Sequence, residues 1–349
     1  MKTRFDVQVV DLRTVTAIEL DDLWRYEMHL WSDRLRWDAS GAFAALRRIA
    51  ARGGLPGKAL RVHDRIVGYT YYGTAGYLGV MAGLVVLPDW NRSDVGETLL
   101  TNTIHEMRRQ GVSRIESRFV SVDCPWLGAA LETEGFRTYW REFLRYHLGQ
   151  SRSPEHASAS VSLEPWQAPH LAEAAAILQA AYAGGIEAEI LALYRTVDGC
   201  RVVLENIVNQ GRCGVLVPEA SALASDRGQR LGCVVVTEVA PRQAHLPQIA
   251  VRPQYQRQGL GRGLLDYSMR QLAAGGFETL SLIVSRANSR ALQLYQSLGF
   301  QAVFTFPVGI WERSRQHGPE PLFCDGDSAA RPLRPEQVSG EGRGTRLAT

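Results

Sequence analysis

The pattern of apolar and polar residues predicts an alternation of strands and helices along the chain. Short apolar runs bounded by Gly, Pro and polar residues indicate strands, whereas apolar residues at three- and four-residue intervals indicate amphipathic helices. The first half yields strands at Val7–Leu12, Leu60–His63, Ile66–Tyr72 and Gly79–Leu87, and helices at Ala17–Trp31 and Ala42–Ala51. The second half yields strands at Val161–Leu163, Gly214–Val217, Gly232–Glu238 and Leu246–Val251, helices at Ala168–Tyr182 and Glu187–Asn209, and a hairpin loop at Ser221–Arg230. These elements predict an α/β fold.

The second half of the chain repeats the first at an offset of 165 residues. The loop positions Pro253, Tyr255, Arg257 and Gly261 correspond to Pro88, Trp90, Arg92 and Gly96. The following helix keeps its apolar stripe, in which Leu260, Leu264, Leu265, Met269 and Leu272 correspond to Val95, Leu99, Leu100, Ile104 and Met107. A stripe at helical spacing packs on a sheet. The repeat therefore predicts two copies of one fold.

The repeat and the composition together predict the domain boundaries. Residues 1–150 form the first domain and residues 161–314 the second. Residues 151–160 are rich in Ser and Ala and are expected to form a linker. Residues 315–349 lose the apolar periodicity and gain Gly, Pro and charged residues, so they are expected to be a disordered tail.

Composition and charge exclude several classes of function. A net charge of +3 without a basic tract argues against nucleic-acid binding. The first residues do not resemble a signal peptide, and the longest apolar run, Ala75–Pro88, is too short to span a membrane. Five cysteines without a C-x-x-C pair and eight histidines without ligand spacing argue against a disulfide framework and a metal site. We expect a cytoplasmic monomer or homodimer that needs no metal.

Candidate chemistry lies in the loop Gln256–Gly263, which reads Gln-Arg-Gln-Gly-Leu-Gly-Arg-Gly. The loop joins the strand end Ile249–Val251 to an amphipathic helix, and a helix start directs unpaired N–H groups and a positive dipole toward one spot. Three glycines allow a close approach of the backbone, and two arginines add positive charge. The loop therefore predicts a pyrophosphate site, although it lacks both the G-x-G-x-x-G spacing and the Gly-Lys-Ser/Thr ending of other nucleotide loops.

This loop resembles the acyl-CoA loop of the GNAT superfamily of N-acetyltransferases, whose signature is Gln/Arg-x-x-Gly-x-Gly/Ala after a strand. The second signature of that family, N-x-x-A-x-x-L-Y-x-x-x-G-F, matches the segment Asn288–Phe300. The resemblance implies two tandem GNAT folds, each a mixed, mostly antiparallel sheet flanked by helices. It also implies an N-acetyltransferase that uses acetyl-CoA and a small amine-bearing acceptor. The tandem arrangement, with both signatures complete only in the second half, is similar in architecture to that of the mycothiol synthases.

The resemblance also implies roles for individual residues. Acetyl-CoA would be bound by Ile249, Ala250, Val251, Gln256, Arg257, Gln258, Gly259, Leu260, Gly261, Arg262, Gly263 and Asn288. The strand end is expected to splay from its neighbour, which frees backbone amides for the pantetheine arm and the thioester oxygen. Tyr295 is the expected general acid, because a phenol with a reference pKa of about 10 is protonated at neutral pH and can donate to a thiolate.

The identity of the general base stays open. Glu238 and His245 both lie near the strand end and are candidates, and a water relay without a single essential base is an alternative. Glu187 and Glu189 are candidates for attracting a cationic acceptor, or are ordinary acidic residues at a helix start.

The first copy departs from both signatures. Asp94 and Glu97 stand where the second copy has Gly259 and Arg262, and Ala130 takes the place of the tyrosine. Asp123 lies near the place of Asn288. Carboxylates repel a pyrophosphate and alanine cannot supply a proton, so we expect the first copy to be a scaffold or part of the acceptor pocket. Two other functions remain open: a non-catalytic acyl-CoA-binding or regulatory protein, and acetylation of a thiol-sugar amine of the mycothiol pathway.

Overall fold

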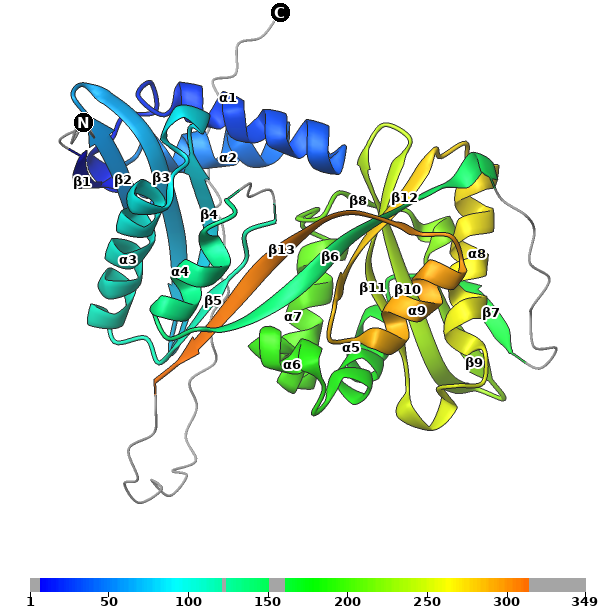
Figure 1. Cartoon of the computed structure of the whole chain (residues 1–349). Coiled ribbons are helices and arrows are strands. Elements are labelled where there is room, and N and C mark those ends of the chain that lie inside the picture. Colours follow the sequence, from blue (N-terminus) through cyan, green and yellow to red (C-terminus); the bar gives the residue numbers. More distant parts are fainter. Residues whose placement is uncertain (1–6, 121–123, 151–160, 314–349) are drawn as a thin grey trace, which may run out of the picture. The chain divides into compact units, whose positions relative to one another are not determined.

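The structure is a computed structural model that describes residues 7–120, 124–150 and 161–313 (Figure 1). The predicted linker 151–160 and the predicted tail 315–349 lie outside the described residues, as does Asp123. The described residues form a sheet of thirteen strands with helices packed against it. The expected mixed α/β fold is therefore confirmed.

The first copy begins with a strand and two helices and continues with a three-stranded antiparallel meander. Its elements are β1 (Val7–Asp11), α1 (Asp21–Leu30), α2 (Ser40–Ala50), β2 (Gly57–Val62), β3 (Arg65–Ala75), β4 (Leu78–Val86), α3 (Ser93–Arg109), β5 (Arg114–Ser117), α4 (Leu127–Thr133) and β6 (Arg137–His147). The strands and helices predicted up to β4 are confirmed within a few residues at their ends.

The second copy repeats this order. Its elements are β7 (Ser162–Pro165), α5 (His170–Tyr182), α6 (Ile186–Ile190), α7 (Val197–Val208), β8 (Val215–Leu216), β9 (Ala222–Asp226), β10 (Gln229–Ala240), β11 (Gln243–Val251), α8 (Leu260–Ala274), β12 (Thr279–Ser285), α9 (Ser289–Ser297) and β13 (Gln301–Glu312). The strands β5, β6, β12 and β13 were not among the predicted elements.

Two predictions for the second copy are wrong. The helix expected over Glu187–Asn209 is broken into α6, a 3₁₀ turn and α7, because Thr196 is extended and its hydroxyl caps α7 by accepting from the Gly199 amide at 3.0 Å. The segment Ser221–Arg230 is not a loop: Ala222–Asp226 is a strand inside the sheet, and only Arg227 and Gly228, both with positive φ, make the turn. Small residues such as alanine pack in this strand without giving a strong apolar pattern.

The faces of the sheet are covered because side chains alternate along each strand. In β10, Val234 and Val236 pack toward α8, whereas Cys233 and Val235 pack toward α5 and α7. The first copy has the same layers, with α3 and α4 over one face and α1 and α2 over the other.

The two copies exchange their last strands. The strand order is β1-β2-β3-β4-β5-β13-β6-β12-β11-β10-β9-β7, so β13 from the second copy pairs with β5 of the first, and β6 from the first copy pairs with β12 of the second. The strands β6 and β13 also pair with each other and run side by side in Figure 1. The predicted ranges 1–150 and 161–314 thus follow the repeat along the sequence, while the sheet is continuous across them.

Candidate functional site

The centre of the second copy is a point where two parallel strands part. The strands β11 and β12 pair from Gln243 opposite Thr279 only as far as Leu246 opposite Leu282. Beyond this point β11 continues to Val251 beside β10, and β12 continues to Ser285 beside β6. Pro247, which has no N–H to offer, follows the last pair. The expected splay of the strand end is therefore confirmed, and its two edges face a gap that we call the splay.

Alternate residues of β11 direct their backbone groups into the splay. The Arg252 amide donates to the Leu231 carbonyl of the neighbouring β10 side. The carbonyls of Ile249 and Val251, by contrast, accept from side chains: Tyr182 Oη at 3.1 Å and Gln256 Nε2 at 2.9 Å. Because N–H and C=O of one residue point to the same side of an antiparallel strand, the amides of Ile249 and Val251 face the splay and that of Ala250 faces β10.

The loop that follows β11, which we call the anion cradle, has a backbone conformation suited to binding an anion. Arg257 and Gly259 have φ of 62° and 83°, both in the left-handed region, and such turns direct consecutive N–H groups toward one point. Gly259 is the N-cap of α8 and supplies no side-chain cap. The Gly263 amide makes its helical bond to the Gly259 carbonyl at 2.9 Å, so the three amides between them have no helical acceptor. The first turn of α8 contains no acidic residue.

The glycine at the start of the helix shows how the two copies differ. A Cβ added at Gly261 would meet Leu294 at 3.8 Å and Val251 at 3.9 Å, which are ordinary contacts. A Cβ added at Gly96 in the first copy would lie 1.9 Å from the ring of Trp126. The ring is held there by a hydrogen bond from its Nε1 to Asn91 Oδ1 at 2.9 Å. Trp126 therefore fills the space above the first turn of α3.

The loop of the first copy also lacks the backbone and charge of a cradle. Arg92, its N-cap, is extended with φ of −117°, and Asp94 in the first turn pairs with Arg92 at 3.1 Å. Sequence comparison identified Asp94 but missed Trp126. The signal that could have found it is a large aromatic residue in the first copy where the second copy has the small Ala291.

Asn288 caps the start of α9, whereas Tyr295 lies on the buried face of this helix. Asn288 is the N-cap of this helix, and its Oδ1 accepts from the Ala291 amide at 3.2 Å. Tyr295 is buried, with 6 % of its surface exposed, and packs against Phe300. Burial, reinforced by the negative charge of Glu187, raises the pKa of Tyr295 above its ordinary value. The phenol is therefore protonated at neutral pH.

Two further tyrosines reach the splay from the opposite face of the sheet. Tyr182 at the end of α5 donates to the Ile249 carbonyl, and Tyr194 accepts from Gln248 Nε2 at 2.6 Å. Burial raises the pKa of both phenols, and the ring centroids of Tyr182 and Tyr194 lie 4.7 Å apart. We call Tyr182, Tyr194 and Tyr295 the tyrosine cluster. Sequence reasoning identified only Tyr295, since the other two belong to no signature.

The two candidates for the general base, Glu238 and His245, both make contacts within the protein. Glu238 lies beside Ala244, on the paired part of β11, and its Oε1 accepts from the Arg242 amide in the adjoining turn at 3.0 Å. His245 is buried against Trp37, with its Nδ1 3.0 Å from Ser281 Oγ. Burial lowers the pKa of His245 to about 3, so its ring is neutral at pH 7. The structure gives neither residue a contact with the tyrosine cluster.

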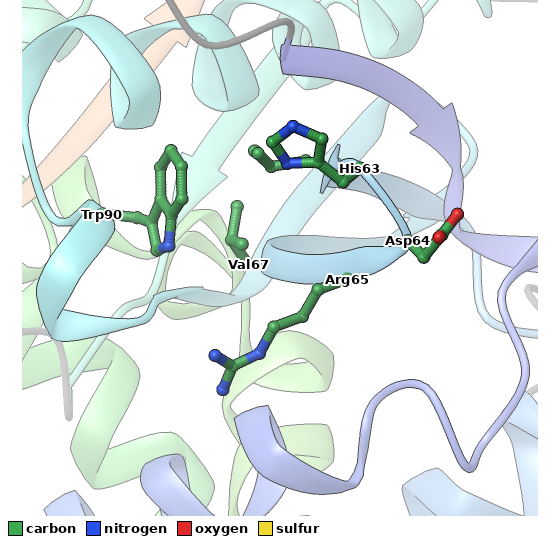
Figure 2. A pocket seen from close by; sticks show the side chains of 6 residues that line it. His63, Asp64, Arg65, Val67 and Trp90 are labelled. Atoms are coloured by element: carbon green, nitrogen blue, oxygen red, sulfur yellow. The ribbon is translucent and has the colours of Figure 1, made fainter. Parts of the chain in front are cut away.

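A separate cavity of about 390 Å³ lies in the first copy (Figure 2). The turn between β2 and β3 supplies His63, Asp64 and Arg65 to its wall, and Trp90 lies opposite. The Arg65 guanidinium is paired with Asp22 at 3.2 Å. None of the residues predicted for the acetyl-CoA site lines this cavity.

Over the ranges 7–120, 124–150 and 161–313, no group of three or more His, Cys, Asp or Glu side chains is arranged to hold a metal ion. In the same ranges, no helix has the length and apolar character needed to cross a membrane.

Comparison with known sequences agrees with the geometry of the second copy. Residues 198–300 match the family described as "Acetyltransferase (GNAT) family". The [ribosomal protein bS18]-alanine N-acetyltransferase of Escherichia coli (strain K12) is 45% identical over 71 residues, which are 20% of this chain and 48% of that protein. The chain thus spans about half the length of these curated relatives. The mycothiol acetyltransferase of Thermobifida fusca (strain YX) is 26% identical over 255 residues, which are 69% of this chain and 74% of that protein.

Solved structures share the fold over most of the chain. A GCN5-related N-acetyltransferase from Sphaerobacter thermophilus superimposes with a TM-score of 0.60 at 15% identity, covering 89% of this chain and 96% of that chain. A tandem GNAT protein from the clavulanic acid biosynthesis pathway gives a TM-score of 0.53 at 15% identity, covering 90% of this chain and 100% of that chain. The family match thus places a GNAT domain within the second copy, and over most of the chain the fold is similar to that of a solved tandem GNAT protein.

Proposed function

We propose that the second copy transfers an acetyl group from acetyl-CoA to a primary amine of a small molecule or peptide, by direct attack in a ternary complex. The observation that carries the proposal is the order of features along one strand. The strand β11 parts from β12, presents the amides of Ile249 and Val251, and runs directly into an uncapped helix start. A thioester carrier with a pyrophosphate needs backbone amides for its thioester end and a helix start for its pyrophosphate, in this order along the chain.

The residues divide the work of binding the donor. The amides of Leu260, Gly261 and Arg262 have no helical acceptor and would hold the pyrophosphate, with the charges of Arg257 and Arg262 nearby. The pantetheine arm would lie along the edge of β11. One freed amide there would bond the thioester oxygen and stabilise the negative charge that forms on it during attack.

The chemical step is an acyl transfer. The neutral amine attacks the thioester carbon, the new C–N bond forms, and the C–S bond breaks. The sulfur leaves as a thiolate with a reference pKa near 8.5 and takes a proton from the Tyr295 phenol. The proton lost by the amine passes to solvent, because the contacts of Glu238 and His245 assign neither of them the role of base.

The acceptor has two candidate classes, each suggested by a relative. One relative is an alanine N-acetyltransferase of a ribosomal protein, which suggests a peptide amine. The other is a mycothiol acetyltransferase whose match extends over both copies, which suggests a small thiol-sugar amine. The coverage of the second match favours the small acceptor.

The test is a release assay for free CoA thiol with the full chain, acetyl-CoA and a panel of amines that includes an alanine-initiated peptide and a glucosamine-based thiol. We expect amine-dependent thiol release and one CoA bound in the second copy. Tight CoA binding without release for any amine would instead support a non-catalytic acyl-CoA-binding protein. A folded chain that does not bind CoA would end the proposal.

A further inference from the structure

The short segment between α5 and α7 lies beside the tyrosine cluster and is held by strands near the junction of the two copies. We call Ile186–Ala192 the α6 segment. Its Ala192 amide donates to Glu116 Oε1 of β5 at 2.9 Å, and its Glu189 carboxylate accepts from Tyr139 Oη of β6 at 2.8 Å. Arg114 of β5 donates to the Glu189 carbonyl. These partners all belong to the first copy.

The α6 segment is attached to a buried network of charged side chains. The Arg114 and Glu116 side chains are 2% and 1% exposed and lie 2.8 Å apart. Glu312 of β13 adds a second carboxylate to Arg114 at 2.5 Å. Removing one member of such a network leaves an uncompensated buried charge, so the network is strongly coupled to the native arrangement. The α6 segment is therefore attached to one of the least exposed polar parts of the sheet.

One contact of the α6 segment differs from the others because its β6 residue lies beside the end of β12. Glu187 Oε2 accepts from Arg141 Nη2 at 3.0 Å, and the two side chains are only 13% and 19% exposed. Arg141 lies on β6 opposite Ser285, the last residue of β12. The Glu187 charge raises the pKa of all three phenols of the tyrosine cluster, and Arg141 opposes the effect on Tyr194 and Tyr295. In the chain, Glu187 lies between Tyr182 and Tyr194, and its partner Arg141 lies beside the end of β12.

The strand exchange explains how Arg141 comes to this place. In sequence it belongs to the first copy, but β6 lies between β12 and β13 and pairs with β12, one of the two strands that part at the splay. A side chain of the first copy thus contacts the α6 segment of the second beside the end of β12.

We propose that Glu187, held in place by Arg141, binds the amine of the acceptor, and that the first copy serves the reaction by holding the α6 segment. This inference rests on the proposed function. The carboxylate accepts a hydrogen bond from the amine and favours acceptors that are cationic in solution, such as aliphatic primary amines. Before attack the ammonium loses its proton to water. The neutral amine then attacks, the C–N bond forms and the C–S bond breaks. The attacking nitrogen loses its second proton to water, and the thiolate takes the Tyr295 proton, which solvent replaces. Glu187 is an amine-binding residue and Arg141 is a positioning residue.

The experiment compares E187Q with E189Q, using the amine substrate found in the release assay. The control changes the same charge two residues away on α6, where the carboxylate meets Tyr139 and not Arg141. We expect E187Q to raise the KM for the amine by about tenfold or more, because hydrogen bonds to an ionised acceptor are roughly twice as strong as neutral ones. We expect the CoA dissociation constant to be unchanged in both variants, and E189Q to keep the wild-type KM.

A charge swap separates amine binding from a merely structural ion pair. The double variant R141E/E187R keeps two opposite charges in contact but replaces the carboxylate of α6 by a cation. We expect it to unfold at a denaturant concentration near that of the wild type and to keep the raised KM. Wild-type KM in either E187Q or the folded swap variant overturns this inference alone. A wild type that binds CoA but acetylates no amine overturns the proposed function, and this inference with it.

Discussion

A negative charge placed in the anion cradle gives the sharpest test of the second copy. Gly259 is the N-cap of α8 with φ of 83°, and nothing lies within 4 Å of a Cβ added there. The Gly259→Asp substitution therefore meets no steric obstacle within the protein. It reproduces the residue that the first copy has at Asp94. We expect it to abolish tight CoA binding through charge repulsion.

The size of the effect follows from Coulomb's law. At about 6 Å and an effective dielectric constant of about 40, two unit charges repel by roughly 1.4 kcal/mol. A pyrophosphate with two charges would then lose roughly 3 kcal/mol of binding free energy, which is about a hundredfold in affinity. Salt screens this term, so the loss should shrink markedly at about 1 M salt, where the screening length is near 3 Å.

The matched control is Gly259→Asn. Asn has the shape of Asp without its charge, and both tolerate the left-handed region better than other side chains. Both variants therefore share the conformational cost of leaving glycine, about 1–2 kcal/mol of folding free energy. Gly259→Ala reports that cost without an added polar group.

The assay is calorimetric titration of CoA into the three variants and the wild type, at low and high salt. We expect Asn and Ala to weaken binding only modestly and Asp to weaken it about a hundredfold more than Asn at low salt. Equal affinities for the Asp and Asn variants would refute the assignment of the pyrophosphate to this helix start, together with the charge argument for the first copy.

The remaining predictions concern single side chains. Tyr295→Phe should lower kcat by about 10²–10⁴-fold and leave CoA affinity unchanged in titration, and an unchanged kcat removes Tyr295 from the mechanism. Because the pKa of Tyr295 is raised, ionisation of this phenol should cause no loss of wild-type rate up to about pH 10. Gly96→Ala should lower the free energy of unfolding measured in urea by about 1–3 kcal/mol, because its Cβ meets the Trp126 ring. Gly261→Ala should change that free energy little, and equal losses in the two variants contradict the difference between the copies. The pKa of His245 falls to about 3 on burial, so the unfolded chain binds the proton more readily, and stability should decline as pH falls from about 6.5 toward 3. His245→Phe should flatten that decline in urea titrations at several pH values. If the slope is unaltered, the decline is caused by other groups.

The prediction for the cradle was possible from sequence because its determinants are local. A strand, a glycine-rich turn and an amphipathic stripe are contiguous in the chain, and the left-handed conformation at Gly259 favours glycine. The second signature is equally local, and the capping role of Asn288 and the burial of Tyr295 on one helix face both follow from spacing along α9.

For the amine side of the proposed site, the sequence offered Glu187 as one candidate for attracting a cationic acceptor but could not predict its partners. Glu187, Arg141 and Tyr182 come from α6, β6 and α5, which no short motif links, and the acidic start of α6 looks like any helix that complements its dipole. For Glu238 and His245, the sequence showed suitable chemistry near the strand end. Their partners, the Arg242 amide and Ser281, depend on the turn and on the pairing with β12.

The strands β6 and β13 show which features follow from the sequence and which depend on the tertiary structure. The sequence by itself determined two copies of one fold, the glycine-rich helix start proposed to bind a phosphate, and the acidic residues that stand in its place in the first copy, because each depends on residue types at fixed separations. Only the tertiary structure decided that the copies exchange their last strands and that Arg141 thereby reaches Glu187. Both copies provide an equivalent free edge, at β5 and at β12, and a local pattern of residues cannot say which edge a strand will pair with. That choice is made by the packing of the whole sheet.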